Sequence, residues 1–118
     1  MVEVLHGAGT PVVASNTLAG GALTGKYLAP GASGRVAERR DLPWVARAME
    51  AAPQLLPLAE RLGTTPAVLA IAFTLANPDV VSTLFGATSA EQVRTNAMAL
   101  DVLAALDDAA LAELRSIS

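Results

Sequence analysis

A glycine-rich loop directly after a short apolar run is the feature that most constrains how this chain folds. The apolar run is Val12-Val13-Ala14, and the loop that follows reads SNTLAGGALTGKY over residues 15–27. A buried strand that opens into such a loop brings main-chain N–H groups close to an anion, and Lys26 adds a positive charge at the rim. The pattern therefore predicts a site for a phosphate-bearing ligand after the first strand.

The spacing of this loop also matches the phosphate loop of nucleotide triphosphatases up to its last position. Gly20 and Gly25 are separated by four residues, and Lys26 follows. A triphosphatase loop continues with a Ser or Thr that binds magnesium and opens a helix. Here the next residue is Tyr27, and LAPG at residues 28–31 has the composition of a turn. This departure disfavours a triphosphatase.

Two short apolar segments have the character of buried strands, at residues 11–15 and 80–85. Between them lie a long Gly/Pro-rich loop over residues 17–42 and a helical pattern over residues 44–62. Pro53 and Pro57 interrupt that pattern, which predicts a kink or break. Strands separated by helices pair in parallel, so the sequence predicts an α/β fold.

Three polar residues occupy positions typical of helix N-caps. Thr65 precedes Pro66, which predicts a helix to about residue 77. Ser89 has Gln92 three residues later, as in a capping box, and Asp107 precedes a last helix over residues 109–117. A further helix is expected to end near residue 7 or 9, so one helix lies before the first strand and two lie after the second.

Three blocks, taken in order, resemble aldo-keto reductases of the potassium-channel beta-subunit-like branch. Residues 15–27 are similar to the family's run after barrel strand seven, aromatic-Ser-Pro-Leu-x-x-Gly-x-Leu-[Ser/Thr]-Gly-Lys-Tyr. VSTLFGATSAEQVRTN at residues 81–96 resembles strand eight and the helix that holds the adenosine end of NADPH. LAERLGTTPAVLAIAF at residues 58–73 follows the pattern between them.

The resemblance implies part of a (β/α)8 TIM barrel rather than a whole one. A complete barrel takes about 250 residues, and this chain has 118. We therefore expect two parallel strands, equivalent to barrel strands seven and eight, with their helices. Residues 1–118 would form the C-terminal portion of a truncated aldo-keto reductase domain. Open strand edges would then pair with another copy or with a complementary half-barrel chain.

The resemblance also implies NADP(H) as the cofactor and places its contacts in both loops. Leu18, Gly21, Thr24 and Lys26 fall where the family wraps the pyrophosphate, and Asn16 is a further cofactor position. Arg35 lies about where an arginine meets the adenosine phosphate, although a shifted alignment gives this role to Arg39 or Arg40. Gly86, Thr88, Gln92 and Asn96 match the second block, with Thr88, Gln92 and Asn96 at helical spacing on one face.

Departures from the family concern the nicotinamide end and the reaction itself. Ser15 replaces the aromatic residue that stacks on the nicotinamide, Asn16-Thr17 replace Ser-Pro, and Thr95 replaces a glutamate. The family's catalytic Asp, Tyr, Lys and His lie on earlier strands, and no residue here aligns with them. No catalytic residue is therefore assigned, and the enzymatic status of the chain alone stays open. With one histidine and no cysteine, we expect no metal site.

Composition excludes several partners. The net charge is −3 and the pI is about 4.9, which argues against nucleic acid. The longest apolar run, residues 66–76, is shorter than the ~20 residues of a membrane span, so we expect a cytoplasmic protein. Two functions remain. The first is the NADP(H)-binding C-terminal segment of an enzyme that reduces aldehydes or ketones. The alternative is a non-catalytic remnant or interaction module that self-associates through exposed barrel edges.

Overall fold

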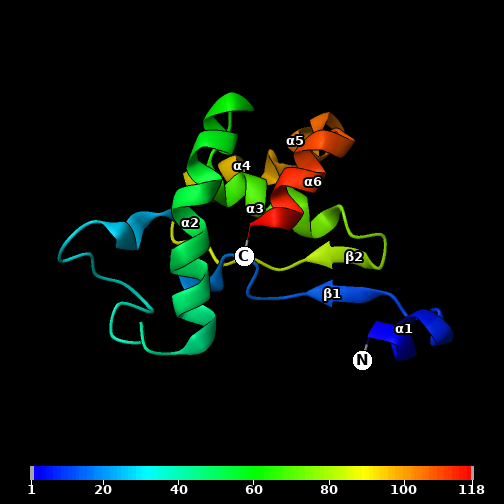
Figure 1. The fold of residues 1–118 in the computed structure, drawn as a ribbon, viewed down its shortest axis with the longest axis horizontal. Coiled ribbons are helices and arrows are strands. Elements are labelled where there is room, and N and C mark those ends of the chain that lie inside the picture. Colours follow the sequence, from blue (N-terminus) through cyan, green and yellow to red (C-terminus); the bar gives the residue numbers. More distant parts are fainter. Residues whose placement is uncertain (1, 118) are drawn as a thin grey trace.

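Two parallel strands lie beside a group of helices that are gathered on one side of them. The computed structural model describes residues 2–117, without the side chains of residues 2, 3 and 6. The elements are α1 (Val2–Ala8), β1 (Val12–Ala14), the 3-10 turns η1 (Ala19–Thr24) and η2 (Lys26–Leu28), α2 (Pro43–Arg61), α3 (Pro66–Leu75), β2 (Val80–Thr83), α4 (Ala90–Ala97), α5 (Ala99–Ala105) and α6 (Asp108–Ser116). Figure 1 shows α2 as a long column past the arrow ends of the two strands, with α3 to α6 above the strands in this view.

The strands pair in parallel, as the sequence predicts. Val12 lies opposite Val80 and Ala14 opposite Thr83, with an irregularity between Val12 and Val13. Within the described residues this sheet has two strands, so each strand leaves one edge unpaired. The expected α/β class is therefore confirmed, and the first loop and the helices α2 and α3 connect the strands.

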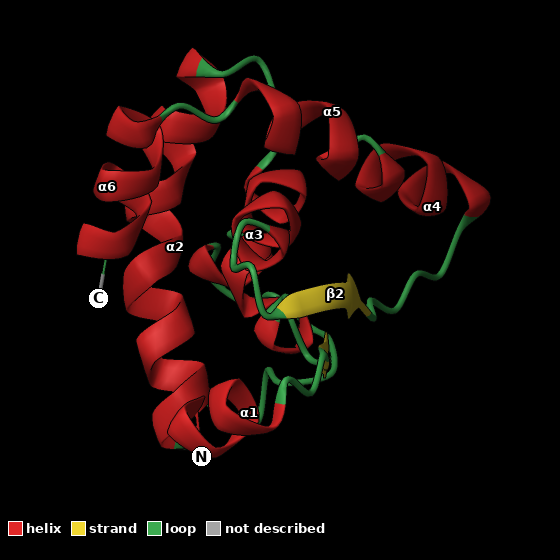
Figure 2. Cartoon of the chain, turned by 90° about the vertical axis from the view of Figure 1, so that its right-hand side faces the viewer, coloured by secondary structure: helices red, strands yellow, loops and turns green. Residues whose placement is uncertain are grey.

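The apolar helix α3 forms the centre of the molecule. Its sequence, PAVLAIAFTL, contains no charged residue, and residues 68–72 are all buried. A helix that is apolar on every side is stable in water only when other elements surround it. Here α2, α4, α5, η1 and β2 all pack against α3, and Figure 2 shows it enclosed by these elements.

The expected break in α2 is absent, because this helix continues through both prolines. Each proline lacks an N–H and so leaves one carbonyl of the preceding turn without its helical partner. Pro53 and Pro57 are four residues apart and both are exposed, so they share the solvent face, where water can bond the freed carbonyls. The opposite face, which includes Leu55 and Leu58, is buried and keeps the helix in place.

The three predicted N-caps are confirmed by hydrogen bonds. The side-chain oxygens of Thr65, Ser89 and Asp107 each accept a main-chain N–H three residues later, at 3.3, 3.2 and 2.8 Å. The single helix expected after Ser89 is wrong, however. It is divided at Met98, whose ψ of −8° ends α4 and begins α5. The helix expected before the first strand is present as α1.

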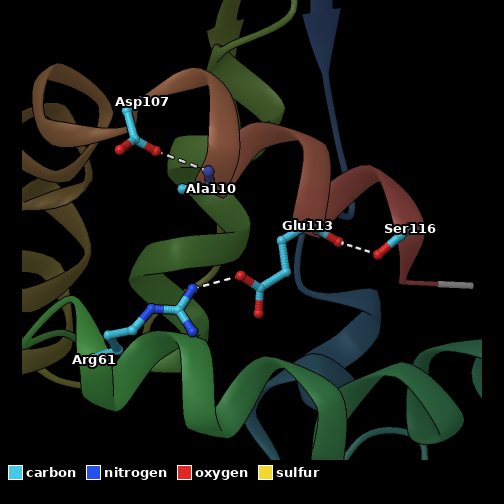
Figure 3. Close-up of polar contacts among 5 residues, drawn as sticks. All are labelled: Arg61, Asp107, Ala110, Glu113 and Ser116. Carbon is cyan, nitrogen blue, oxygen red and sulfur yellow. Dashed lines mark hydrogen bonds and ion pairs between the residues drawn. The ribbon is translucent and has the colours of Figure 1, made fainter.

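Helix α6 is attached to α2 by both polar and apolar contacts. Leu114 is buried in a cluster with Leu58 and Leu69. On the surface, Arg61 near the end of α2 forms an ion pair with Glu113, as Figure 3 shows. These contacts hold the last helix against the middle of the chain.

None of the described helices is by itself long and apolar enough to cross a membrane; α2 and α3 would meet that test only together, and they are bent by 92° at their junction.

Candidate functional site

Two loops that carry most of the expected site residues begin at the carboxyl ends of the two parallel strands. The first loop covers residues 15–42, after β1, and the second covers residues 84–89, after β2. One hydroxyl connects them: Thr17 Oγ1 lies 2.6 Å from Thr83 Oγ1 and also donates to the Leu84 carbonyl at 3.2 Å. The Leu84 N–H in turn donates to the Ala14 carbonyl at 2.8 Å. Segments that are 66 residues apart in sequence therefore start from one point.

Apolar packing holds the same two loops on one part of the core. Leu18 from the first loop and Phe85 from the second both pack against a cluster of α3 and α5 residues that includes Val68 and Ile71. Gly86 directly follows Phe85, so the second loop leaves the core beside the first. Leu18 is half-buried, and its side chain attaches the first loop to this cluster.

The first loop uses most of its own polar groups to keep its shape. Asn16 adopts a left-handed conformation at φ 58°, which asparagine tolerates, and its Oδ1 accepts the Gly20 N–H at 3.0 Å. The Gly21 N–H donates to the Leu18 carbonyl at 2.9 Å. The Thr24 hydroxyl donates to the Gly21 carbonyl at 2.7 Å. In this conformation, the amides of Gly20 and Gly21 and the Thr24 hydroxyl all donate hydrogen bonds within the loop.

Lys26 keeps its charge available at the loop surface. The Lys26 side chain is exposed and makes no ion pair with the residues that the structure describes. Its Nζ lies 4.7 Å from the centre of the Tyr27 ring, where a cation is attracted by the ring's electrons. Gly21 lies beside this side chain, because a Cβ at that position would be 3.2 Å from Lys26 Cε. Lys26 is thus positioned beside the loop, without a carboxylate partner in the part of the chain that the structure describes.

Tyr27 closes the loop, a role that the sequence reasoning missed. Its side chain is 1% exposed and packs with Val36 and Val45. The hydroxyl accepts the Val36 N–H at 3.3 Å and lies 3.4 Å from the Gly20 carbonyl, to which it donates. The available signal was composition: this is the single tyrosine of a chain with 3% aromatic residues, and it follows the glycine-rich run directly.

Three arginines follow in the remainder of the loop. Arg35 is exposed and forms no hydrogen bond or ion pair with the described residues. Arg40 is also exposed, but its Nε donates to the Ala37 carbonyl at 3.3 Å. Arg39 is exposed and precedes the turn into α2. Of the three arginines, Arg35 is the one next to Val36, whose N–H donates to the Tyr27 hydroxyl. The Arg35 guanidinium has no partner within the described residues.

The second loop contains a capping arrangement that differs from the expected one. Ser89 caps α4 through the Gln92 N–H, but Gln92 Oε1 accepts from the Thr88 N–H at 2.7 Å instead of from Ser89. The Thr88 hydroxyl lies 3.2 Å from the same oxygen. The Gln92 side chain therefore bonds the N–H of the residue before the N-cap, and the predicted capping box is only half formed. The expectation that Thr88 shares a helix face with Gln92 and Asn96 is wrong, because Thr88 precedes the N-cap Ser89 and lies outside α4.

Asn96 differs from its two neighbours in being buried. It is 7% exposed, whereas Thr88 and Gln92 are exposed. Its side-chain amide has no hydrogen bond with the residues that the structure describes. No fully buried side-chain polar atom among those residues lacks a partner, so the Asn96 amide retains some contact with solvent. A polar group in this position can bond a ligand that displaces the water.

Within the described residues, Lys26 and Arg35 of the first loop have no ion pair, and Asn96, on α4 after the second loop, is mostly buried and has no hydrogen bond through its side-chain amide. This chemistry suits an anionic ligand with a hydrogen-bonding ring. Among the described residues no group of three metal-binding side chains lies together. Within the same residues, a cavity of about 250 Å³ lies at the amino ends of the strands, and one of about 180 Å³ lies between α2, α3 and α6 and is also lined by Thr17 and Leu23 of the first loop.

Comparison with known proteins identifies the family. The sequence model of the aldo/keto reductase family matches residues 1–118. Protein tas of Escherichia coli is 33% identical over 121 residues, covering 99% of this chain and 34% of that protein. The uncharacterized oxidoreductase YrpG of Bacillus subtilis is 36% identical over 104 residues, covering 86% and 31%. A probable voltage-gated potassium channel subunit beta of Arabidopsis thaliana is 34% identical over 119 residues, covering 95% and 36%.

The fold defines an α/β protein with parallel strands. The chain belongs to the aldo/keto reductase family. It spans about a third of the length of the curated relatives that it matches.

Proposed function

We propose that residues 1–118 are the NADP(H)-binding C-terminal segment of an aldo-keto reductase, with β1 and β2 as the equivalents of barrel strands seven and eight. The observation that carries this proposal is the bond between Thr17 and Thr83, which joins the two loops at the carboxyl ends of parallel strands. Ligands of α/β barrels bind at that end of the strands. A cytoplasmic location stays a prediction.

The residues present fit a phosphate-bearing cofactor. The first-loop contacts would be Asn16, Leu18, Gly21, Thr24 and Lys26, with Arg35 on the adenosine phosphate, and the second-loop contacts would be Gly86, Thr88, Gln92 and Asn96. The Lys26 charge and the Asn96 amide, neither of which has a polar partner within the described residues, support this assignment most directly. Thr24 would have to release its bond to Gly21 before donating to a phosphate.

In the complete enzyme, a bound NADPH would supply the hydride that reduces an aldehyde or ketone. This chain's part would be to bind the phosphates and the adenosine and thereby orient the cofactor. A side-chain acid that protonates the carbonyl oxygen is not assigned to any residue here. We therefore expect the 118-residue chain alone to show no NADPH oxidation with a panel of aldehydes. Protein-dependent oxidation above the blank would contradict this expectation.

The binding test is a titration of the chain with NADP, NAD and 2′-phospho-AMP, followed by NMR. We expect shifts at Lys26 and over residues 86–96, with NADP and 2′-phospho-AMP binding about equally, because Ser15 offers no ring to the nicotinamide. Lys26→Ala should weaken binding by about tenfold, the effect of one charge-assisted hydrogen bond. Arg115→Ala, which removes an exposed charge from α6, is the matched control and should change nothing. No shifts at millimolar ligand would refute the proposal.

The alternative, a module that self-associates through exposed barrel edges, is favoured by the uncovered sheet. Val13, Val81 and Leu84 are 55%, 63% and 58% exposed. Apolar strand residues next to unpaired edges favour pairing with a second copy. Sedimentation of the chain should then show mass that increases with concentration in the micromolar range. A compact monomer at all concentrations would exclude this alternative.

A further inference from the structure

We propose that Tyr27 is a positioning residue that gives the site its preference for a ligand with a 2′-phosphate. This inference rests on the proposed function. Tyr27 would act through its hydroxyl, which fixes the main chain beside Arg35 at a set place relative to Lys26. It would touch no ligand itself, because its side chain is 1% exposed.

The hydroxyl joins two parts of the loop that are otherwise separate. It accepts the Val36 N–H at 3.3 Å and lies 3.4 Å from the Gly20 carbonyl, its acceptor. One group therefore connects the glycine turn, which leads into Lys26, with the residue that directly follows Arg35. Both bonds are made by a buried side chain, where hydrogen bonds are little weakened by competing water.

A second contact holds the residue before Arg35. Gly34 has φ +147°, and a Cβ built there would lie 2.5 Å from the Tyr27 hydroxyl and 2.8 Å from Lys26 Nζ. The main chain thus passes directly over the tyrosine and the lysine amine. Tyr27 lies close to the chain on both sides of Arg35, whereas the guanidinium has no partner among the described side chains.

The two cations have different relations to the same ring. Lys26 Nζ lies over its face, 4.7 Å from the centre, so this contact needs the ring and not the hydroxyl. Arg35 depends on the hydroxyl through Val36. Tyr27→Phe keeps the ring beneath Lys26 Nζ and removes the hydroxyl that bonds Val36. Because NAD lacks the 2′-phosphate that Arg35 would bind, this substitution should weaken NADP binding selectively.

The experiment compares the wild-type chain with Tyr27→Phe and with Thr74→Val, a control that removes a hydroxyl bonded inside α3 at 2.9 Å. Without ligand, Tyr27→Phe should speed hydrogen exchange at the Val36 amide by roughly two- to tenfold, the range that a net hydrogen bond contributes. With ligand, the ratio of the NAD to the NADP dissociation constant should fall by a similar factor, while NAD affinity is unchanged. Thr74→Val should alter neither quantity.

Arg35→Ala tests whether the Tyr27 hydroxyl acts on the NADP preference through Arg35. It should lower the same ratio, and Tyr27→Phe added to it should cause no further loss, because both changes act on one contact. Gly34→Ala is a second variant, whose Cβ would displace the hydroxyl, and it should change the ratio in the same direction.

Three results would overturn the inference: unchanged Val36 exchange in Tyr27→Phe, equal loss of NAD and NADP affinity, or additive effects with Arg35→Ala. A wild-type chain that binds neither nucleotide would refute the proposed function and, with it, the role in selectivity. The Val36 exchange rates would then still show whether the hydroxyl holds the loop, so the two failures are distinguishable.

Discussion

Replacing Gly20 with alanine tests whether the glycine-rich loop is built by close packing. Gly20 has φ +61°, and a Cβ there would lie 2.6 Å from Val36 Cγ1. Val36 is 2% exposed and packs with Tyr27 and Val45, so the methyl group has no free space to enter. The left-handed conformation costs an L-residue about 1–2 kcal/mol. Overpacking adds about 1–3 kcal/mol. We therefore expect Gly20→Ala to lower the free energy of unfolding by about 2–5 kcal/mol.

Gly63→Ala is the matched control, because Gly63 has φ +64° and nothing within 4 Å of its added Cβ. It should cost only the conformational part, about 1–2 kcal/mol. Val36→Ala removes the methyl that Gly20→Ala would strike, so the double variant should be less destabilised than the sum of the two single changes. Urea unfolding followed by circular dichroism measures all four variants. Equal losses at Gly20 and Gly63, or additivity with Val36→Ala, would refute the reasoning.

Three further predictions concern the contacts that join the elements. Thr17→Val removes the bonds to Thr83 and Leu84, so it should destabilise the chain by about 1–2 kcal/mol and speed exchange of the Leu84 amide; unchanged exchange would mean that the strand ends are held otherwise. Asp107→Ala removes the N-cap of α6 and should cost about 1 kcal/mol in urea unfolding. Arg61→Ala breaks the ion pair between Arg61 and Glu113, whose side chains are 57% and 44% exposed, respectively. The loss of unfolding free energy should therefore stay below about 0.5 kcal/mol and vanish in high salt. If Arg61→Ala cost as much as Asp107→Ala, solvent would not be screening the pair.

Local signals in the sequence were sufficient for the parallel strands and the helix starts. A capping oxygen needs only a neighbouring N–H three residues later, so Thr65, Ser89 and Asp107 could be recognised without any knowledge of the tertiary structure. The continuity of α2 could not be recognised in this way. Whether Pro53 and Pro57 break a helix depends on which face is solvated, and that is decided by packing against α3 and η1.

The sequence suggested which residues to consider for the candidate site, and this assignment stays a prediction; it could not indicate which of their hydrogen-bond donors are available. The family pattern placed Thr24 at a phosphate contact, yet its hydroxyl is bonded to Gly21. That bond follows from the φ angles of the glycine turn, which the spacing of residues does not specify. The contribution of Tyr27 was hidden for a similar reason, since its partners Gly20 and Val36 lie seven and nine residues away in an irregular loop.

The two halves of the candidate site depend on different parts of the structure. Tyr27, Val36 and the first half of α2 form a cluster of their own, so the loop that carries Lys26 and Arg35 is packed without help from the strands. Gly86 and Asn96 instead follow β2, whose outer edge is unpaired within the described residues. Loss of order in the sheet should therefore reach the proposed contacts at Gly86 and Asn96 first and leave Lys26 and Arg35 in place. If Lys26 and Arg35 bind the phosphates as proposed, such a chain should still bind inorganic phosphate, and weakly, because few groups remain to enclose the ion.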